Sequence, residues 1–230
     1  MSLIAIITAR GGSKRIPHKN IKNFLGKPII TYSIEAALKS ELFSEVMVST
    51  DDLEIAEISK RYGASIPFMR SASASDDNAT TTDALIDVFE TYTKQGKNFE
   101  CACCIYPTAP FITSEKLIQA YNKLIEDRLD VVFPIMKFSY PIWRSLKKDG
   151  EKLIMNWPQH LNSRSQDLPE TFHDAGQFYF FRVNTFLEEK KLFGENSGGI
   201  EIDETEGQDI DNEMDWRLAE LKYQLMGKML

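Results

Sequence analysis

Residues 3–20 read LIAIITARGGSKRIPHKN, an aliphatic run that passes directly into a loop of glycines and basic side chains. A continuous apolar run such as Leu3 to Thr8 is typical of a parallel strand that helices cover on both faces. Sheets of parallel strands bind ligands beyond the carboxyl ends of their strands, which is where the loop at residues 9–20 begins. The stretch therefore predicts a central strand with a ligand site at its end.

Strand and helix patterns alternate along the rest of the chain. The expected strands are residues 46–49, 99–106, 131–135 and 177–182, and the expected helices carry the stripes at 30–38, 55–62, 85–92, 117–125 and 214–225. Asp51 with Glu54 resembles a capping box at the start of the second helix. The alternation predicts an α/β fold with a mainly parallel sheet and helices on both faces. The loops expected to line one crevice follow Thr8, Thr50, Tyr106 and Ile135.

The alternation breaks between residues 137 and 172, which are rich in Pro, Trp, Lys and Asn. We interpret this stretch as an inserted hairpin or arm, because the strand pattern resumes at Gln177. A length of 230 residues suits one hydrophobic core. The chain is therefore expected to form a single domain over residues 1–230, into which the arm is inserted.

Composition excludes several classes of protein. The net charge is −7, so no large basic surface is available to bind nucleic acid. The apolar runs are too short to cross a membrane, and the first is too short for a secretory signal. Cys101, Cys103 and Cys104 crowd into one expected strand and cannot form a framework of disulfides, so we interpret them as buried structural residues of a cytoplasmic protein. The histidines lack the spacing of a zinc site.

The basic loop at residues 9–20 has the chemistry of a phosphate site. Its cations are Arg10, Lys14, Arg15 and Lys19. Gly11 and Gly12 let the backbone approach a ligand and turn N–H groups toward phosphate oxygens. The loop matches neither the Walker spacing nor GxGxxG, which argues against the common kinases and dehydrogenases. We interpret it as a triphosphate site, and a solvated basic turn is the alternative that the loop alone leaves open.

Near the C-terminus, Asp209 and Asp211 flank a single residue. In extended backbone their side chains point the same way, and two carboxylates can hold Mg²⁺ against the phosphates of a substrate. The pattern therefore indicates a magnesium site. A polar turn that caps the last helix explains the same residues equally well.

Two further polar stretches carry weaker signals. The stretch from Arg70 to Thr82 ends in three threonines before an expected helix. These threonines can cap the helix or contact a ribose or base, and neighbouring ones can do both. The stretch from His173 to Tyr179 places polar groups at the start of a strand without the Ser or Cys of a hydrolytic triad, so we interpret it as substrate recognition.

Together these motifs resemble the signature of the CMP-sialate synthetase (acylneuraminate cytidylyltransferase) family. The resemblance is carried by residues 9–20, 26–28, 48–51, 70–82 and 209–211, and so runs through nearly the whole chain. Within the family, residues 104–111, 164–169 and 173–179 resemble the cytidylyltransferases of pseudaminic acid. The neuraminate enzymes usually carry Gln at the position of Tyr106, so a different contact to the sugar is expected here.

The resemblance implies a Rossmann-like fold and a homodimer paired through the arm. It implies an enzyme that joins CMP from CTP to pseudaminic acid, a nonulosonic acid sugar, with release of pyrophosphate for flagellin or surface glycosylation in a bacterium. The implied catalytic residues are Arg10 and Lys19 on the phosphates, with Asp209 and Asp211 as ligands of the cofactor Mg²⁺. The implied substrate-binding residues are Ala9, Gly11, Gly12, Ser13, Asn20, Arg70, Thr80, Thr82, Tyr106, Arg164, His173, Gln177 and Tyr179.

Some alternatives stay open. Within the enzyme class, the sugar can be neuraminate or another nonulosonate such as legionaminate. Outside it, the chain can be a regulatory module that holds CTP without turning it over. A nicotinamide-dependent dehydrogenase is weakened by the missing dinucleotide fingerprint. Arg164 is the best candidate for the sugar carboxylate, because a guanidinium fork matches a carboxylate, and it can act within its own subunit or across the dimer.

Overall fold

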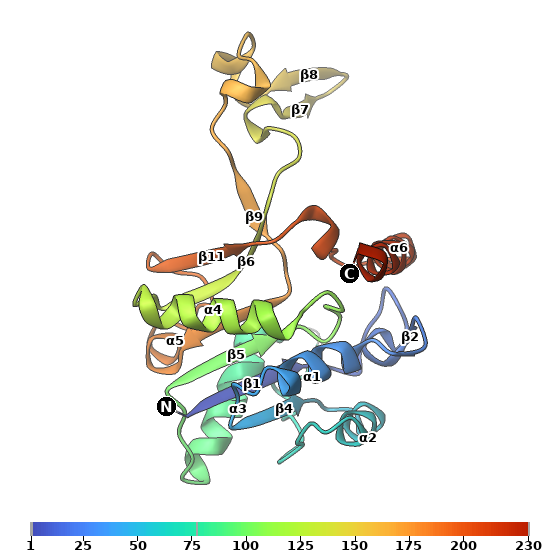
Figure 1. The fold of residues 1–230 in the computed structure, drawn as a ribbon, viewed down its shortest axis with the longest axis vertical. Helices are drawn as coiled ribbons and strands as arrows, with labels where there is room; N and C mark the ends of the chain where they lie inside the picture. The colour runs from blue at the N-terminus through green and yellow to red at the C-terminus, as the bar shows by residue number, and fades with distance from the viewer. Residues whose placement is uncertain (1, 77, 230) are drawn as a thin grey trace.

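A seven-stranded sheet runs through the part of the chain that the structure, a computed structural model, describes: residues 2–76 and 78–229 (Figure 1). Its order is β11-β6-β10-β5-β1-β4, and β9 pairs with the end of β6. The strands are β1 (Leu3–Thr8), β4 (Glu45–Ser49), β5 (Cys101–Ile105), β6 (Val131–Lys137), β9 (Phe172–Asp174), β10 (Phe178–Arg182) and β11 (Ser197–Glu201). Every strand expected from the sequence is present, and β9 and β11 are additional.

The strand directions follow from the path of the chain. β1 is parallel to β4 and β5, and β11 is parallel to β6. β10 is antiparallel to both β5 and β6. The chain leaves β6 at its carboxyl end and returns at the same end through β9, so β10 runs back in the opposite direction. The predicted mainly parallel sheet is confirmed, with β9 and β10 as its antiparallel members.

Helices cover both faces of the sheet (Figure 1). They are α1 (Ile30–Lys39), α2 (Leu53–Arg61), α3 (Thr81–Lys94), α4 (Ser114–Glu126), α5 (Val183–Glu189) and α6 (Glu213–Met229). Alternate residues of β1 enter different cores: Leu3 and Ile7 pack with residues of α1 and α4, whereas Ile4 and Ile6 pack with residues of α3 and α5. Because both faces are buried, the sequence of β1 is continuously apolar.

The stretch between β6 and β9 projects away from the sheet as an arm (Figure 1). It contains the hairpin of β7 (Leu146–Asp149) with β8 (Lys152–Met155) and the short 3₁₀ helices η2 (Ile142–Arg144), η3 (Pro158–His160) and η4 (Ser165–Asp167). The arm exposes the large apolar residues Phe138, Tyr140, Leu146, Leu153, Ile154 and Leu161. The inserted hairpin expected at residues 137–172 is present, and its own fold does not bury its apolar surface.

Helix α6 has two apolar sides. Trp216 and Ala219 are buried against Phe24 and Ile210, and Tyr223 packs on the same cluster. The stripe expected to mark this helix is Met214, Leu218, Leu221 and Leu225, and its residues are between 43% and 69% exposed. The spacing predicted the helix correctly, but this stripe is not the buried side. Residues 216, 219 and 223 form a second stripe, which packs against the protein.

Two other predictions concern the cysteines and whether any helix could span a membrane. Cys101, Cys103 and Cys104 are buried and unpaired in β5, as predicted. Burial raises the pKa of the Cys104 thiol to about 12. The described helices are all too short or too polar to span a membrane.

Candidate active site

The basic loop and the acidic segment at residues 209–213 lie together although they are nearly 190 positions apart. Arg15 Nη1 is 2.6 Å from Asp211 Oδ2. Lys19 Nζ donates to the backbone carbonyl of Ile210 at 2.7 Å. The structure therefore brings both predicted parts of the phosphate site to one place.

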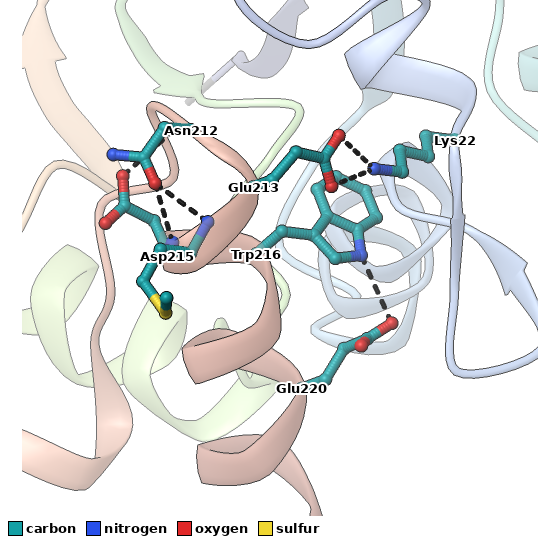
Figure 2. Close-up of polar contacts among 7 residues, drawn as sticks. Lys22, Asn212, Glu213, Asp215, Trp216 and Glu220 are labelled. Carbon is teal, nitrogen blue, oxygen red and sulfur yellow. Dashed lines mark hydrogen bonds and ion pairs between the residues drawn. The ribbon is translucent and has the colours of Figure 1, made fainter.

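Lys22, two residues beyond the basic loop, makes a further contact at the start of α6 (Figure 2). Lys22 Nζ lies 2.7 Å from both carboxylate oxygens of Glu213 and 4.6 Å from the centre of the Trp216 ring. The indole N–H of Trp216 donates to Glu220 Oε1 at 3.1 Å. The start of α6 is thus contacted by Lys22 through an exposed ion pair and over the face of the Trp216 ring.

The cap of α6 is made by Asn212 and Asp215 (Figure 2). Asn212 Oδ1 accepts from the N–H groups of Met214 and Asp215 at 2.8 and 3.1 Å. Asp215 Oδ2 accepts from the N–H groups of Asp211 and Asn212 at 2.9 and 3.0 Å. Capping and metal binding were alternatives for this segment, and capping falls to residues 212 and 215. In the described chain the carboxylates of Asp209 and Asp211 take no part in the cap.

A cavity of about 460 Å³ opens beside the basic loop, at the carboxyl ends of β1 and β5. Its lining residues are Thr8, Arg10, Ser13, Lys14, Arg15, Lys19, Asn20, Thr81, Tyr106, Pro107 and Thr108. The loops after Thr8 and Tyr106 line it as predicted. The loops that follow Thr50 and Ile135 are not part of this lining in the described residues.

Polar contacts within the loop fix its shape. Asn20 is buried, and its Nδ2 donates to the carbonyl of Arg10 at 2.8 Å. Arg10 Nη1 donates to the carbonyl of Asp76 at 3.0 Å. The N–H of Ser13 donates to the carbonyl of Gly11 at 2.9 Å. A Cβ at Gly12 would have open space within 4 Å, so Gly12 leaves room for a ligand to approach.

Asp51 and Asp52 hold the loop from the end of β4. The N–H of Gly11 donates to Asp51 Oδ1 at 3.0 Å. The prediction that this N–H faces a phosphate is therefore wrong for Gly11. A Cβ at Gly11 would lie 2.6 Å from Asp52 Oδ2, so close packing requires a glycine there. Asp52, not Asp51, caps α2 through the N–H groups of Glu54 and Ile55 at 2.8 and 3.1 Å. The expected capping box at Asp51 was therefore placed one residue too early.

Arg70 is buried and fastens the end of β4. Its side-chain Nε donates to Ser49 Oγ at 2.9 Å, and its backbone N–H donates to the carbonyl of Thr50 at 2.8 Å. Burial lowers the pKa of Arg70, whereas the Asp51 carboxylate raises it. The N–H of Ala9 donates to the carbonyl of Ser49 at 3.0 Å. Arg70 thus supports the backbone on which the basic loop begins, and among the described residues it does not line the cavity.

The carboxylates of Asp209 and Asp211 share one ammonium neighbour. Burial lowers the pKa of Lys19, whereas the charges of Asp211 and Asp209 raise it, so both carboxylates act on the same ammonium. Two carboxylates suit Mg²⁺, which takes its other ligands from phosphates and water. The described residues contain no cluster of three or more His, Cys, Asp or Glu side chains.

The threonines before α3 divide their tasks. Thr80 caps the helix: its Oγ1 accepts from the N–H of Asp83 at 3.2 Å, and Asp83 Oδ2 accepts from the N–H of Thr80 at 2.8 Å. The backbone N–H and the hydroxyl of Thr80 both donate to the Asp83 carboxylate, and these two bonds lower the pKa of Asp83. Thr81, which the sequence did not single out, lines the cavity, whereas Thr80 and Thr82 are absent from its described lining. Position 77 of this loop lies outside the described residues.

Two tyrosines join the cavity to the start of β10. Tyr106 lines the cavity, and its ring packs against the Tyr179 ring with 5.7 Å between ring centroids. Burial raises the pKa of both tyrosines. Tyr179 donates in turn to Asp174 Oδ2, and the N–H of Gly176 donates to Asp174 Oδ1 at 2.8 Å. Asp174 was not among the predicted binding residues, although it stands inside the stretch from 173 to 179.

The other predicted sugar residues contact other parts of the protein. Gln177 is buried, and its Nε2 donates to the carbonyl of Glu206 in η5 (Glu204–Glu206) at 2.7 Å. The His173 ring packs against Phe138, tilted by 55°, with 4.8 Å between ring centroids. Arg164 lies in the arm, where it binds Asp167 through two contacts of 2.7 and 3.2 Å. The described lining of the cavity includes none of these three predicted residues.

A larger cavity of about 790 Å³ lies between α1, α6 and the start of α4. Its lining combines apolar residues such as Tyr32 and Ile112 with Lys27, Glu35 and Glu206. Its lining carries two lysines and four carboxylates, so it has a weaker preference for polyanions than the cavity beside the basic loop.

Comparisons with known proteins found a matching family model, similar proteins and a similar solved structure. The family model described as cytidylyltransferase matches residues 4–194. A pseudaminic acid cytidylyltransferase from Campylobacter jejuni is 42% identical over 226 residues, which cover 98% of this chain and 97% of that protein. A CMP-N,N'-diacetyllegionaminic acid synthase from Legionella pneumophila is 31% identical over 229 residues, which cover 98% of this chain and 97% of that protein. The structure of a CMP:2-keto-3-deoxy-manno-octonic acid synthetase complexed with CTP shares the fold, with a TM-score of 0.72 and 18% identity over 100% of both chains.

Proposed function

The chain belongs to the cytidylyltransferase family, and on that premise we propose that it transfers CMP from CTP to pseudaminic acid with release of pyrophosphate. The observation that carries the proposal is one cavity that the cations of the basic loop line, beside an acidic segment suited to a divalent ion. A polyphosphate with a bound metal ion is complementary to this site, because its phosphates pair with the cations and its metal ion pairs with the carboxylates.

In the proposed reaction, the anomeric hydroxyl of the sugar attacks the α-phosphorus of CTP in line. Negative charge then grows on the pyrophosphate that leaves. Arg10 and Lys19 neutralise that charge from the cavity wall, and Lys19 is held in place by the carbonyl of Ile210. Cations that are already fixed stabilise the transition state without reorganising during the reaction.

Asp209 and Asp211 are the proposed ligands of Mg²⁺, the proposed cofactor. When bound, the ion would neutralise phosphate charge and acidify the attacking hydroxyl. Asp215 positions the backbone of Asp211, and Lys19 limits the mutual repulsion of the two carboxylates. Gly11, Gly12, Ser13 and Asn20, with Ala9 at the start, are proposed to shape the nucleotide cradle.

The sugar is proposed to lie on the side of the cavity where Tyr106 stands. Tyr179, whose hydroxyl donates to Asp174, packs its ring against Tyr106. The Tyr106 phenol can pair with a hydroxyl or acetamido group of the sugar. His173 and Gln177 are proposed as further sugar contacts, and Arg164 as the partner of the sugar carboxylate. Arg70, Thr80 and Thr82 stay proposed contacts of the cytidine.

We also propose a homodimer in which the arm of each subunit packs on α6 of the other. Each chain has two exposed apolar surfaces: the apolar residues of the arm and the outer stripe of α6, which is Met214, Leu218, Leu221 and Leu225. The arm and α6 both lie at the carboxyl-end side of the sheet (Figure 1). A two-fold axis would let each cover the other. Residues 201–215 also carry eight carboxylates and no base, whereas β7 and β8 carry Lys147, Lys148 and Lys152. Across such a dimer, Arg164 of one subunit can complete the site of the other.

Leu221→Glu is expected to convert the dimer to a monomer at micromolar concentration, because a carboxylate cannot be buried against the arm. The circular dichroism spectrum should not change, since Leu221 is 59% exposed in the protomer. Light scattering coupled to size exclusion measures the mass. The matched control is Leu53→Glu, which changes an exposed leucine of α2 and should leave the dimer intact. A wild-type monomer, or a Leu221→Glu dimer, would contradict the proposed pairing.

The proposed setting is the cytoplasm of a bacterium, where CMP-activated pseudaminate would supply flagellin or surface glycosylation. On this proposal the chain acts between a reaction that makes the free acid and a glycosyltransferase that uses CMP as its leaving group.

The proposed substrate is tested by pyrophosphate release with CTP and each of pseudaminate, legionaminate and neuraminate. We expect kcat/KM to be at least about tenfold higher for pseudaminate, because polar groups that lose their sugar partner are left unpaired. A higher value for legionaminate or neuraminate would assign the chain to that sugar. Saturable binding of CTP without release of pyrophosphate from any sugar would favour the regulatory module.

A further inference from the structure

Arg15 forms an ion pair with Asp211, one of the two carboxylates proposed to bind the metal ion. Its guanidinium contacts Asp211 Oδ2 at 2.6 Å, and it also lines the cavity beside the basic loop. The side chains are 68% and 42% exposed, so the pair is solvated and its disruption costs little. Arg15 therefore stands between two anionic partners, the carboxylate that it holds and any polyphosphate that enters the cavity.

A divalent cation and a guanidinium compete for Asp211. The guanidinium sits within contact distance of Oδ2, and its charge repels a dication that approaches the same oxygen. Lys19 does not block that oxygen, because its ammonium is held by the carbonyl of Ile210. A metal ion that takes Asp211 must therefore displace Arg15, whereas Lys19 can stay where it is.

The displaced side chain has a destination nearby. Arg10, Ser13 and Lys14 line the same cavity as Arg15, so the guanidinium can swing from the acidic segment to phosphate oxygens held there. A guanidinium binds phosphate through parallel N–H bonds as well as it binds carboxylate. Phosphate then replaces Asp211 as the anionic partner of Arg15, so the guanidinium charge keeps a counterion throughout.

We propose that Arg15 is an exchange residue, which pairs with Asp211 in the free protein and moves to the polyphosphate of CTP when a divalent cation takes Asp211. The proposal rests on the proposed function, because it needs CTP in the cavity. Its consequence is reciprocal coupling: the free protein binds the cation weakly, and CTP strengthens cation binding by removing Arg15 from the carboxylate. The pair thereby disfavours a metal site that is loaded without nucleotide.

The test is a titration with Mn²⁺, followed by the electron paramagnetic resonance signal of the free ion, without and with CTP. Arg15→Ala should lower the Mn²⁺ dissociation constant of the nucleotide-free protein about three- to fivefold, because Asp211 loses its competitor. The same variant should bind CTP about tenfold more weakly in the presence of Mn²⁺. The strengthening of Mn²⁺ binding by CTP should shrink. Arg15→Lys keeps the charge and should stay near the wild type in Mn²⁺ affinity.

Lys14→Ala is the matched control, because it removes a neighbouring positive charge and leaves Arg15 in place. It should weaken CTP binding without a comparable gain in Mn²⁺ affinity. Equal gains in the two variants would reduce the effect to overall charge and overturn the proposal. An unchanged Mn²⁺ affinity in Arg15→Ala would overturn it too, as would unchanged CTP binding. A wild-type protein that binds no CTP would instead refute the proposed function, so the two failures are distinct.

Discussion

Asp211→Ala is expected to abolish Mg²⁺-dependent release of pyrophosphate, lowering kcat/KM at least about a thousandfold while the chain stays folded. A metal ion contributes several kcal/mol to the stabilisation of phosphoryl charge, and each 1.36 kcal/mol is about tenfold in rate. The fold survives because the carboxylate makes one solvated ion pair, with Arg15, and an exposed pair of this kind contributes about 0–1 kcal/mol. Steady-state assays across a range of Mg²⁺ concentrations measure the effect.

The control for Asp211 is Glu213→Gln. Glu213 is an acidic neighbour in the same segment, but its carboxylate pairs with Lys22 at the start of α6 (Figure 2). The control should lose less than about threefold in kcat/KM, because this surface pair is not part of the metal site. Near-normal turnover in Asp211→Ala, or an equal loss in both variants, would remove the metal assignment.

Arg10→Ala is the second substitution with a large expected effect, a loss of about 10²- to 10³-fold in kcat/KM. A fixed donor aimed at charge that develops in the transition state is commonly worth this much. Arg10 lines the cavity at the end of β1 and donates to the carbonyl of Asp76 at 3.0 Å. Loss of one such hydrogen bond should shift the melting temperature by only a few degrees. Initial rates and thermal unfolding of the same preparation measure both effects.

Arg61→Ala serves as the control for Arg10, since Arg61 is an exposed cation in the last turn of α2. It removes the same charge from the protein at a distance from the cavity and should leave kcat/KM within about twofold, because exposed charges are screened by salt. If Arg10→Ala kept wild-type kinetics, the basic loop would be a solvated turn and not a phosphate site.

Much of the fold is predictable because its residues repeat with simple periods. The run from Leu3 to Thr8 buries alternate residues in two cores, so it is apolar throughout and predicts β1 with its correct bounds. The break at residues 137–172 predicts the arm, because its composition departs from the alternation. The loop at residues 9–20 and the aspartates at 209 and 211 were expected to meet, and the Arg15–Asp211 contact confirms it.

Other features depend on tertiary contacts that periodicity does not encode. Asp51 and Asp52 are both suitable caps for α2, and Asp52 takes that place because Asp51 receives the N–H of Gly11 from a distant loop. Thr81 reaches the cavity because the cap at Thr80 fixes where α3 begins. The exposed stripe of α6 has the same spacing as a buried one, so the sequence predicts the helix but not which side faces the protein.

The most direct test of the shared phosphate site is a crystal structure with CTP and Mn²⁺, in which the anomalous signal locates the metal. We expect one Mn²⁺ peak in contact with Asp209, Asp211 and the triphosphate, and the same triphosphate within hydrogen-bond distance of Arg10 and Lys19. A triphosphate bound in the larger cavity between α1 and α6, or a metal peak away from the acidic segment, would contradict it.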